Sequence, residues 1–211
     1  MKKETIILVG GGGYCKECID VIEAENKYKI AGIVDLDSNV GKKVMGYSII
    51  SNDEGSVALI KDYKNFLITV GQIKNNRIRA EKFYELKKNG AFFPVIISPS
   101  AQVSRNSFIG EGTILKQNVV ICSDVKIGKN CIINIGALVA HESSIGDNTH
   151  VSSNVSINGQ CKVGGGVFIG SGSVLFNNIE VCSDVIIGAG SVVFKSIKEP
   201  GTYIGNPVSK L

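Results

Sequence analysis

Two neighbouring side chains, His141 and Glu142, form the pair in this sequence best suited to moving a proton. An imidazole accepts a proton near neutral pH, and an adjacent carboxylate can hold the ring in one tautomer and stabilise its protonated form. The only other histidine in the chain is His150. The pair therefore predicts general-base chemistry, with His141 as the base and Glu142 as its helper.

These residues lie in a strictly periodic half of the chain. A Val, Ile or Leu stands at every sixth position from Ile97 to Val193, seventeen times in succession, and the fifth place of each hexad holds a small or β-branched residue. A period of six does not match the 3.6 residues of a helical turn. Short strands joined by tight turns, with about eighteen residues per three-sided coil, are expected instead. Residues 97–198 are thus predicted to form a triangular parallel β-helix.

Residues eighteen apart should stack on one corner of such a β-helix. His141 occupies a turn position that points outward, and the residue stacked on it is Gly159, whose backbone N–H could face a reacting carbonyl. On another corner, Ser153, Ser171 and Ala189 form a column of small residues that leaves a groove. The stacking therefore predicts a catalytic corner and a separate ligand groove.

Residues 1–96 alternate between predicted strands and helices, which indicates a small parallel α/β domain with a half-Rossmann-like sheet. The expected strands are residues 5–9, 30–34 and 66–70, and the expected helices are 14–25, 52–61 and 76–89. The first strand runs into Gly10 to Gly13, where bare backbone can approach a phosphate, and the second ends at Asp35, placed to meet a ribose or base. Because Cys15 stands where a dinucleotide motif has its third glycine, a single nucleotide is favoured over a nicotinamide cofactor.

Composition excludes several classes of function. The net charge of +4 comes from scattered Lys and Arg, without the basic stripe and interleaved aromatics of a nucleic-acid-binding surface. No apolar run is long enough to cross a membrane, and residues 5–9 read as a strand rather than a signal peptide. A cytoplasmic protein without nucleic-acid or membrane partners is expected.

The six cysteines fit that reading as reduced thiols. Cys131 and Cys161 occupy the small inward place of their hexads and should pack as small apolar residues. Cys15 and Cys18 form a single CxxC in the first turn of a predicted helix, where a structural role is favoured over metal or redox chemistry.

Taken together, both halves resemble the sugar O-acyltransferase family of the sialic acid O-acetyltransferases and the bacillosamine and perosamine N-acetyltransferases. The resemblance rests on the Gly-rich loop, residues 75–79 (Asn-Asn-Arg-Ile-Arg), residues 97–101 (Ile-Ser-Pro-Ser-Ala), Ile133-Asn134, His141-Glu142 and the closing Gly205-Asn206-Pro207. It implies a left-handed β-helix that binds acetyl-CoA between the subunits of a homotrimer, and an N-terminal domain that binds a nucleotide-linked sugar. The loop itself reads Gly12-Gly13-Tyr14-Cys15, where the family usually has Gly-Gly-His-Gly.

The resemblance also implies roles for single residues. His141 is the base, Glu142 its helper, and Asn134 a polar residue beside the base that contacts the substrate. The acetyl-CoA contacts are His150, Ser171 and Ala189, to which the stacking adds Gly159. The substrate contacts expected in or near the N-terminal domain are Gly12, Gly13, Tyr14, Asp35, Asn75 and Arg79.

The expected function is that of an acetyl-CoA-dependent N-acetyltransferase acting on a nucleotide-linked 4-amino-4,6-dideoxy sugar in bacterial surface glycan biosynthesis. A sialic acid O-acetyltransferase and a non-catalytic β-helix scaffold are the alternatives. A γ-type carbonic anhydrase shares the β-helix, but its zinc needs three histidine ligands and this chain has two histidines, so no metal site is predicted. The predicted domains are 1–96 and 97–198, followed by a C-terminal tail, 199–211.

Overall fold

The computed structural model describes residues 3–72 and 76–210, and the chain divides into two compact units. The first contains Met1–Gly71 and Arg77–Ile97, and the second contains Gln72–Asn76 and Ser98–Leu211. The short segment Gln72–Asn76 thus groups with the periodic half of the chain, although it lies within the first half of the sequence. None of the helices in the described ranges is long and apolar enough to span a membrane.

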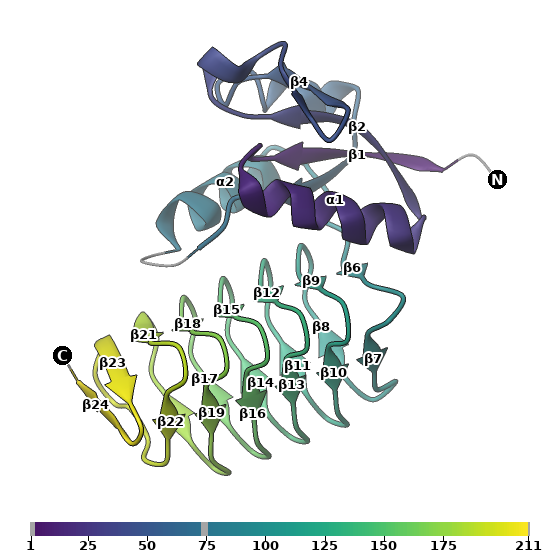
Figure 1. Ribbon diagram of the computed structural model, residues 1–211. Coiled ribbons are helices and arrows are strands. Elements are labelled where there is room, and N and C mark those ends of the chain that lie inside the picture. The colour runs from purple at the N-terminus through teal and green to yellow at the C-terminus, as the bar shows by residue number, and fades with distance from the viewer. Residues whose placement is uncertain (1–2, 73–75, 211) are drawn as a thin grey trace. The chain divides into compact units, whose positions relative to one another are not determined.

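The first unit is a five-stranded sheet in the order β3-β4-β2-β1-β5, with the three predicted strands side by side and parallel (Figure 1). Its elements are β1 (Glu4–Val9), α1 (Gly13–Glu25), β2 (Tyr28–Val34), the 3-10 turn Asp37–Asn39, β3 (Lys43–Val44), β4 (Tyr47–Ser51), the 3-10 turn Ala58–Lys61, β5 (Asn65–Ile68), α2 (Arg77–Lys88) and β6 (Ile96–Ile97). Residues 6–9 of β1 are at most 1 % exposed, as expected of a parallel strand covered on both faces. The predicted parallel α/β domain is confirmed.

The prediction of a helix over residues 52–61 of this unit is wrong. Only a 3-10 turn forms there, over Ala58–Lys61, and the preceding residues make the antiparallel hairpin β3-β4. The hairpin turns through Met45 and Gly46, which both have positive φ, as a tight two-residue hairpin turn requires. Strand β4 then extends the sheet by pairing parallel with β2.

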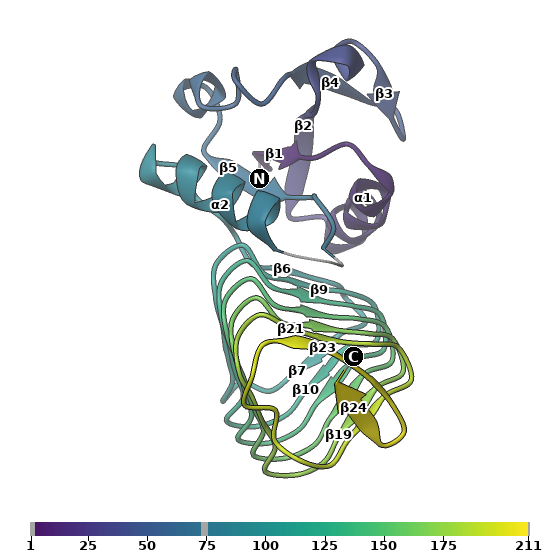
Figure 2. The same cartoon turned by 90° about the vertical axis from the view of Figure 1, so that its left-hand side faces the viewer.

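The second unit is a parallel β-helix whose coils have a triangular outline (Figure 2). Its first two sides are the sheets β22-β19-β16-β13-β10-β7 and β20-β17-β14-β11-β8, and β9, β12, β15, β18 and β21 follow one another in the third. From β7 to β22 the paired residues are eighteen apart, for example Val120 with Leu138 and Lys126 with Ser144. The strands are β7 (Gln102–Val103), β8 (Phe108–Ile109), β9 (Ile114–Leu115), β10 (Val120–Ile121), β11 (Lys126–Ile127), β12 (Ile132–Ile133), β13 (Leu138–Val139), β14 (Ser144–Ile145), β15 (His150–Val151), β16 (Ser156–Ile157), β17 (Lys162–Val163), β18 (Phe168–Ile169), β19 (Val174–Leu175), β20 (Glu180–Val181), β21 (Val185–Ile187) and β22 (Val192–Val193).

The end of the chain is more ordered than the predicted tail. Strand β23 (Gly201–Gly205) pairs parallel with β21, and β24 (Val208–Lys210) folds back antiparallel on β23. This hairpin covers the last coil, whose backbone groups would otherwise form an open sheet edge.

Hydroxyl groups at the inward fifth places hold successive coils together. Thr149 is fully buried, and its Oγ1 donates to the Gly164 carbonyl at 2.9 Å and accepts from the Val167 N–H at 3.3 Å. Thr113, Ser143 and Ser173 repeat both contacts in other coils. The small inward position therefore selects for hydrogen bonding as well as for size.

Replacing Thr149 with Val is expected to lower the free energy of unfolding by about 1–3 kcal/mol, because it leaves a buried carbonyl and a buried N–H without this partner. Denaturant unfolding followed by circular dichroism measures the change. The matched control is Ser144→Val, at an outward place of β14, which should change the free energy by less than about 0.5 kcal/mol. Equal losses in the two variants would contradict the role of the hydroxyl.

Candidate active site

His141 and Glu142 form the turn that follows β13, and both side chains are more than half exposed, at 58 % and 54 %. His141 Nδ1 lies 3.1 Å from Glu142 Oε2. Because a carboxylate can only accept, the ring proton sits on Nδ1, and Nε2 carries the lone pair that can take a proton. The predicted helper contact is therefore present, and it points the basic atom away from Glu142.

Glu142 is itself held by a residue that the sequence reasoning missed. Gln160, stacked one coil later, donates from Nε2 to Glu142 Oε2 at 3.1 Å. Both residues have positive φ, 59° and 62°. From Gly112 to Gly190 every other residue at this turn position is Gly, Asn or Asp, the types that tolerate the left-handed region best. That exception in the repeat is the sequence signal that could have identified Gln160.

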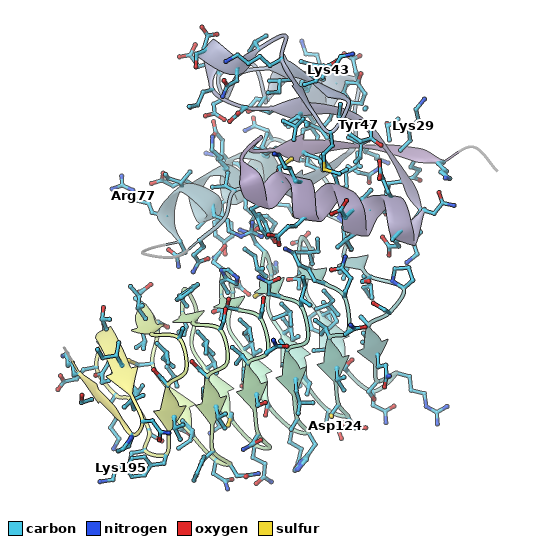
Figure 3. The ribbon with its side chains drawn as sticks, viewed as in Figure 1. Lys29, Lys43, Tyr47, Arg77, Asp124 and Lys195 are labelled. Carbon is cyan, nitrogen blue, oxygen red and sulfur yellow. The ribbon has the colours of Figure 1, made fainter. Side chains whose placement is uncertain are left out.

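Gly159 lies directly against the imidazole, as the eighteen-residue stacking predicts. A Cβ at Gly159 would stand 2.6 Å from both Cε1 and Nε2 of His141. Gly159 therefore leaves room for the ring. Asp124 stacks in the same column as Glu142, and Lys195 stacks in the same column as His141. Both are labelled in Figure 3, where they mark this corner of the β-helix.

A hollow of about 590 Å³ opens beside Glu142 on the outward face of the second sheet. It is lined by Arg105, Asn106, Ser107, Phe108, Asp124, Val125, Lys126, Glu142, Ser143, Ser144 and Lys162. The catalytic corner thus borders a space large enough for part of a small ligand.

Replacing Glu142 with Gln is expected to lower kcat about 10- to 100-fold, because the neutral amide no longer fixes the Nδ1–H tautomer or stabilises the protonated ring. Steady-state kinetics on the purified variant measures the effect. Gln160→Ala, which leaves the carboxylate in place, should cost less than Glu142→Gln. An unchanged kcat in Glu142→Gln would remove Glu142 from the mechanism.

The column of small residues predicted to leave a ligand groove stacks on another corner, as expected. The Gly172 N–H donates to the Ser153 carbonyl and the Gly190 N–H to the Ser171 carbonyl, at 2.9 and 2.8 Å. The hydroxyls of Ser152 and Ser171 are 2.8 Å apart.

Asn134 occupies this same corner, and its Oδ1 accepts from the N–H of Ile135 at 2.9 Å. Asn134 and His141 therefore flank β13, and one side of the triangular coil separates them. Within one chain Asn134 does not lie beside His141, because the six residues between them include strand β13, and its place beside the base stays a prediction.

His150 is a strand residue and not a turn residue. It begins β15, is 8 % exposed, and has Nδ1 2.7 Å from the carbonyl oxygen of Gln72. Its ring meets Phe168 edge-on, with 5.1 Å between the ring centres.

The Gly-rich loop and Asp35 meet at the carboxyl edge of the first unit's sheet. A Cβ at Gly11 would come within 2.8 Å of Asp35 Oδ2, so only a glycine lets the carboxylate approach the loop here. Asp35 also accepts from Asn39 Nδ2 at 2.9 Å. Helix α1 starts at Gly13 without a side-chain cap, and nothing in the described ranges lies within 4 Å of a Cβ placed at Gly12 or Gly13. Open N–H groups at a helix start suit a phosphate.

Of the predicted substrate contacts, Arg79 lies in the interior, and Tyr14 is partly exposed with its hydroxyl buried. Arg79 is 1 % exposed and donates to the carbonyls of Ile68 and Val70 at 2.7 and 3.0 Å, so we correct its role to support of the chain after β5. Burial raises the pKa of the Tyr14 phenol well above its usual value, with Cys18 and Arg79 close by. The Tyr14 hydroxyl therefore faces the protein. Asn75 lies outside the described residues.

The CxxC cysteines are both buried, in line with the structural role expected for them. Cys15 and Cys18 are both 0 % exposed free thiols. Burial raises the pKa of the Cys15 thiol to about 11, which leaves it protonated at neutral pH. Among the described residues, no cluster of three or more His, Cys, Asp or Glu could hold a metal ion.

Comparison with known proteins supports both units. Residues 5–86 match the family described as the PglD N-terminal domain, and residues 142–177 match the bacterial transferase hexapeptide (six repeats). No curated protein sequence matches significantly.

Solved structures match almost the whole chain. A mutant of perosamine N-acetyltransferase from Caulobacter crescentus, in complex with CoA and GDP-perosamine, is 27 % identical, with TM-score 0.92 over 98 % of this chain and 96 % of that one. The acetyltransferase domain of PglB from Neisseria gonorrhoeae FA1090, in complex with acetyl coenzyme A, is 27 % identical, with TM-score 0.90 over 100 % of both chains. WeeI from Acinetobacter baumannii AYE is 25 % identical, with TM-score 0.86 over 99 % of this chain and 100 % of that one.

Proposed function

We propose that this chain, which joins a PglD-type N-terminal domain to a left-handed hexapeptide-repeat β-helix, acetylates the amino group of a nucleotide-linked 4-amino-4,6-dideoxy sugar. It is an acetyltransferase with acetyl-CoA as its co-substrate, the kind of reaction carried out by the N-acetyltransferases that it matches along their whole length. The acceptor class and a place in bacterial surface glycan synthesis are the new parts of the proposal.

The observation that carries the proposal is the chain of contacts from Gln160 through Glu142 to His141. Nε2 of His141 removes a proton from the acceptor amine as its nitrogen attacks the thioester carbonyl. The N–H of Gly159, beside the ring, is the donor available to the developing oxyanion. When the tetrahedral intermediate collapses, the C–S bond breaks and the imidazolium returns its proton to the CoA thiolate.

The separation of the two corners supports assembly of the site from more than one chain. His141 and Gly159 follow strands of the sheet that contains β13. Ser171 and Ala189, the proposed acetyl-CoA contacts, precede strands of that sheet and so lie at the opposite strand ends. A transfer site that uses both corners requires a second copy, which we propose to be a neighbour in a homotrimer. Light scattering on the purified protein tests the trimer.

The N-terminal crevice supports the acceptor class. Gly12, Gly13 and the start of α1 offer N–H groups to a phosphate, and Asp35 offers a carboxylate to a ribose or base. Asn75 remains a proposed contact on the grounds of the sequence alone.

One assay tests the function. The protein is incubated with acetyl-CoA and, separately, with UDP-, GDP- and dTDP-linked 4-amino sugars and with sialic acid, and free CoA is followed against a His141→Ala control. Turnover with an amino sugar is expected. Turnover with sialic acid alone would favour an O-acetyltransferase instead, and no turnover with any acceptor would favour a non-catalytic scaffold.

A further inference from the structure

The sequence contains two Asn-Gly pairs, Asn89-Gly90 and Asn158-Gly159, and they stand in different surroundings. Asparagine is a thermolabile residue, and it is most so before glycine, because no side chain then hinders attack of the next main-chain nitrogen on the carboxamide. In the first pair both reacting groups are engaged. Asn89 Nδ2 donates to the Glu85 carbonyl at 2.8 Å, and the Gly90 N–H donates to the Lys87 carbonyl at 3.1 Å. These hydrogen bonds protect the first pair from reaction.

The second pair, Asn158-Gly159, has neither reacting group engaged. Among the residues that the structure describes, none forms a hydrogen bond with the carboxamide of Asn158 or with the N–H of Gly159. Asn158 is partly exposed, so water reaches its side chain. Its main-chain N–H donates to the Leu175 carbonyl at 3.1 Å, and its carbonyl accepts from Ser143 Oγ at 3.0 Å. The main chain is therefore fixed, while a free carboxamide stands next to a free nitrogen.

The turns of the β-helix let a carboxamide in this place reach the next nitrogen. Asn134 directly follows β12 just as Asn158 directly follows β16, and Asn134 Oδ1 lies 2.9 Å from the main-chain N of Ile135. Such a distance is close to that from which intramolecular reactions proceed. Ile135 carries a β-branched side chain that hinders its nitrogen, whereas Gly159 carries none. Asn158-Gly159 therefore combines the reachable geometry with the unhindered nucleophile.

We propose that Asn158-Gly159 is a site of spontaneous deamidation at the catalytic corner. The Gly159 nitrogen loses its proton to water and bonds to Cγ of Asn158, the Cγ–Nδ2 bond breaks, and that nitrogen leaves as ammonia. Water then opens the resulting cyclic imide at either carbonyl, which leaves aspartate or isoaspartate at position 158. The only co-reactant is water.

Deamidation alters the surroundings of His141. A Cβ at Gly159 would stand 2.6 Å from Cε1 and Nε2 of the ring, so the two residues are in close contact. Isoaspartate lengthens the main chain by one methylene group directly before Gly159, and either product adds a negative charge. Because a displacement of about 1 Å lowers a rate about 10²-fold, the isoaspartate form is expected to lose acetyltransferase activity by about that factor. This loss rests on the proposed function, whereas the modification itself does not.

Ageing the purified protein at mildly alkaline pH tests the modification. Peptide mass spectrometry and enzymatic methylation of isoaspartate follow both Asn-Gly pairs in the same sample. Deamidation at Asn158 should be at least about tenfold faster than at Asn89, because two hydrogen bonds must break before Asn89-Gly90 can react. In the urea-unfolded chain the two rates should become equal. No reaction at Asn158, or equal rates in the folded protein, would overturn the proposal.

A second readout connects the modification with activity. In Asn158→Gln the longer side chain disfavours the imide, so this variant should keep its rate of CoA release during ageing. Wild type and the matched control Asn177→Gln, one coil later on the same corner, should lose theirs as isoaspartate accumulates. Equal losses in Asn158→Gln and wild type would overturn the link to activity. If the wild-type protein shows no turnover, the proposed function fails, whereas the mass spectra still decide whether Asn158 deamidates.

Discussion

Replacing His141 with Ala is expected to lower kcat about 10²- to 10⁴-fold, with little change in either KM, because the substitution removes the group proposed to take the amine proton in the transition state. The side chain is 58 % exposed, so its loss leaves no buried cavity and the melting temperature should stay within about 2 °C of wild type. Initial rates of CoA release with saturating substrates measure the effect.

Lys195→Ala is the matched control. Lys195 is also exposed, does not line the hollow beside Glu142, and occupies the same column as His141, three coils later. Its removal is expected to leave kcat within about twofold of wild type. Full activity in His141→Ala would show that another group accepts the proton. Equal losses in both variants would show that any change at this corner lowers the rate and that the imidazole has no special role.

Replacing Gly159 with Ala is expected to lower activity about 10²-fold without unfolding the β-helix. The new methyl group would stand 2.6 Å from Cε1 and Nε2 of His141, and the exposed ring can turn away to make room. A base displaced by about 1 Å loses roughly that factor in rate. Kinetics together with thermal unfolding measures the two effects. Asn177→Ala, one coil later in the same column, should retain full activity.

A double-mutant cycle shows whether Gly159→Ala acts through His141. If the methyl group only displaces the imidazole, adding Gly159→Ala to His141→Ala should cost less than about twofold, because the displaced group is already gone. If the two losses multiply and the KM for acetyl-CoA rises, the methyl group blocks the co-substrate instead. The first outcome is expected from the contact distances.

Much of the site geometry follows from the hexads because stacking is periodic. Once strands repeat every six residues and coils every eighteen, His141 must lie next to Gly159, and Ser153, Ser171 and Ala189 must form one column. The same regularity exposes an irregularity that sequence reasoning overlooked. Gln160 occupies a turn position where Gly, Asn and Asp otherwise stand, and it binds Glu142.

Contacts made by the less regular segments could not be predicted in the same way. Arg79 follows a loop that resembles a substrate-binding motif, yet its guanidinium turns inward to the carbonyls of Ile68 and Val70. Residues 52–61 are predicted as a helix, but they form only a 3-10 turn over Ala58–Lys61, after the hairpin at Met45-Gly46 has added β4 to the sheet. Neither arrangement follows from a periodic pattern in the sequence.

The sequence by itself therefore determined the β-helix, its register, the pairing of His141 with Glu142, and the Gly-rich loop between β1 and α1. These depend on side-chain size and spacing at short range or at a constant interval. The tertiary structure alone decided that Asn134 and His141 stand at opposite ends of a strand, that Arg79 and the Tyr14 hydroxyl are buried, and that Nδ1 of His150 meets the Gln72 carbonyl. These depend on which loop packs on which surface, which no repeat specifies.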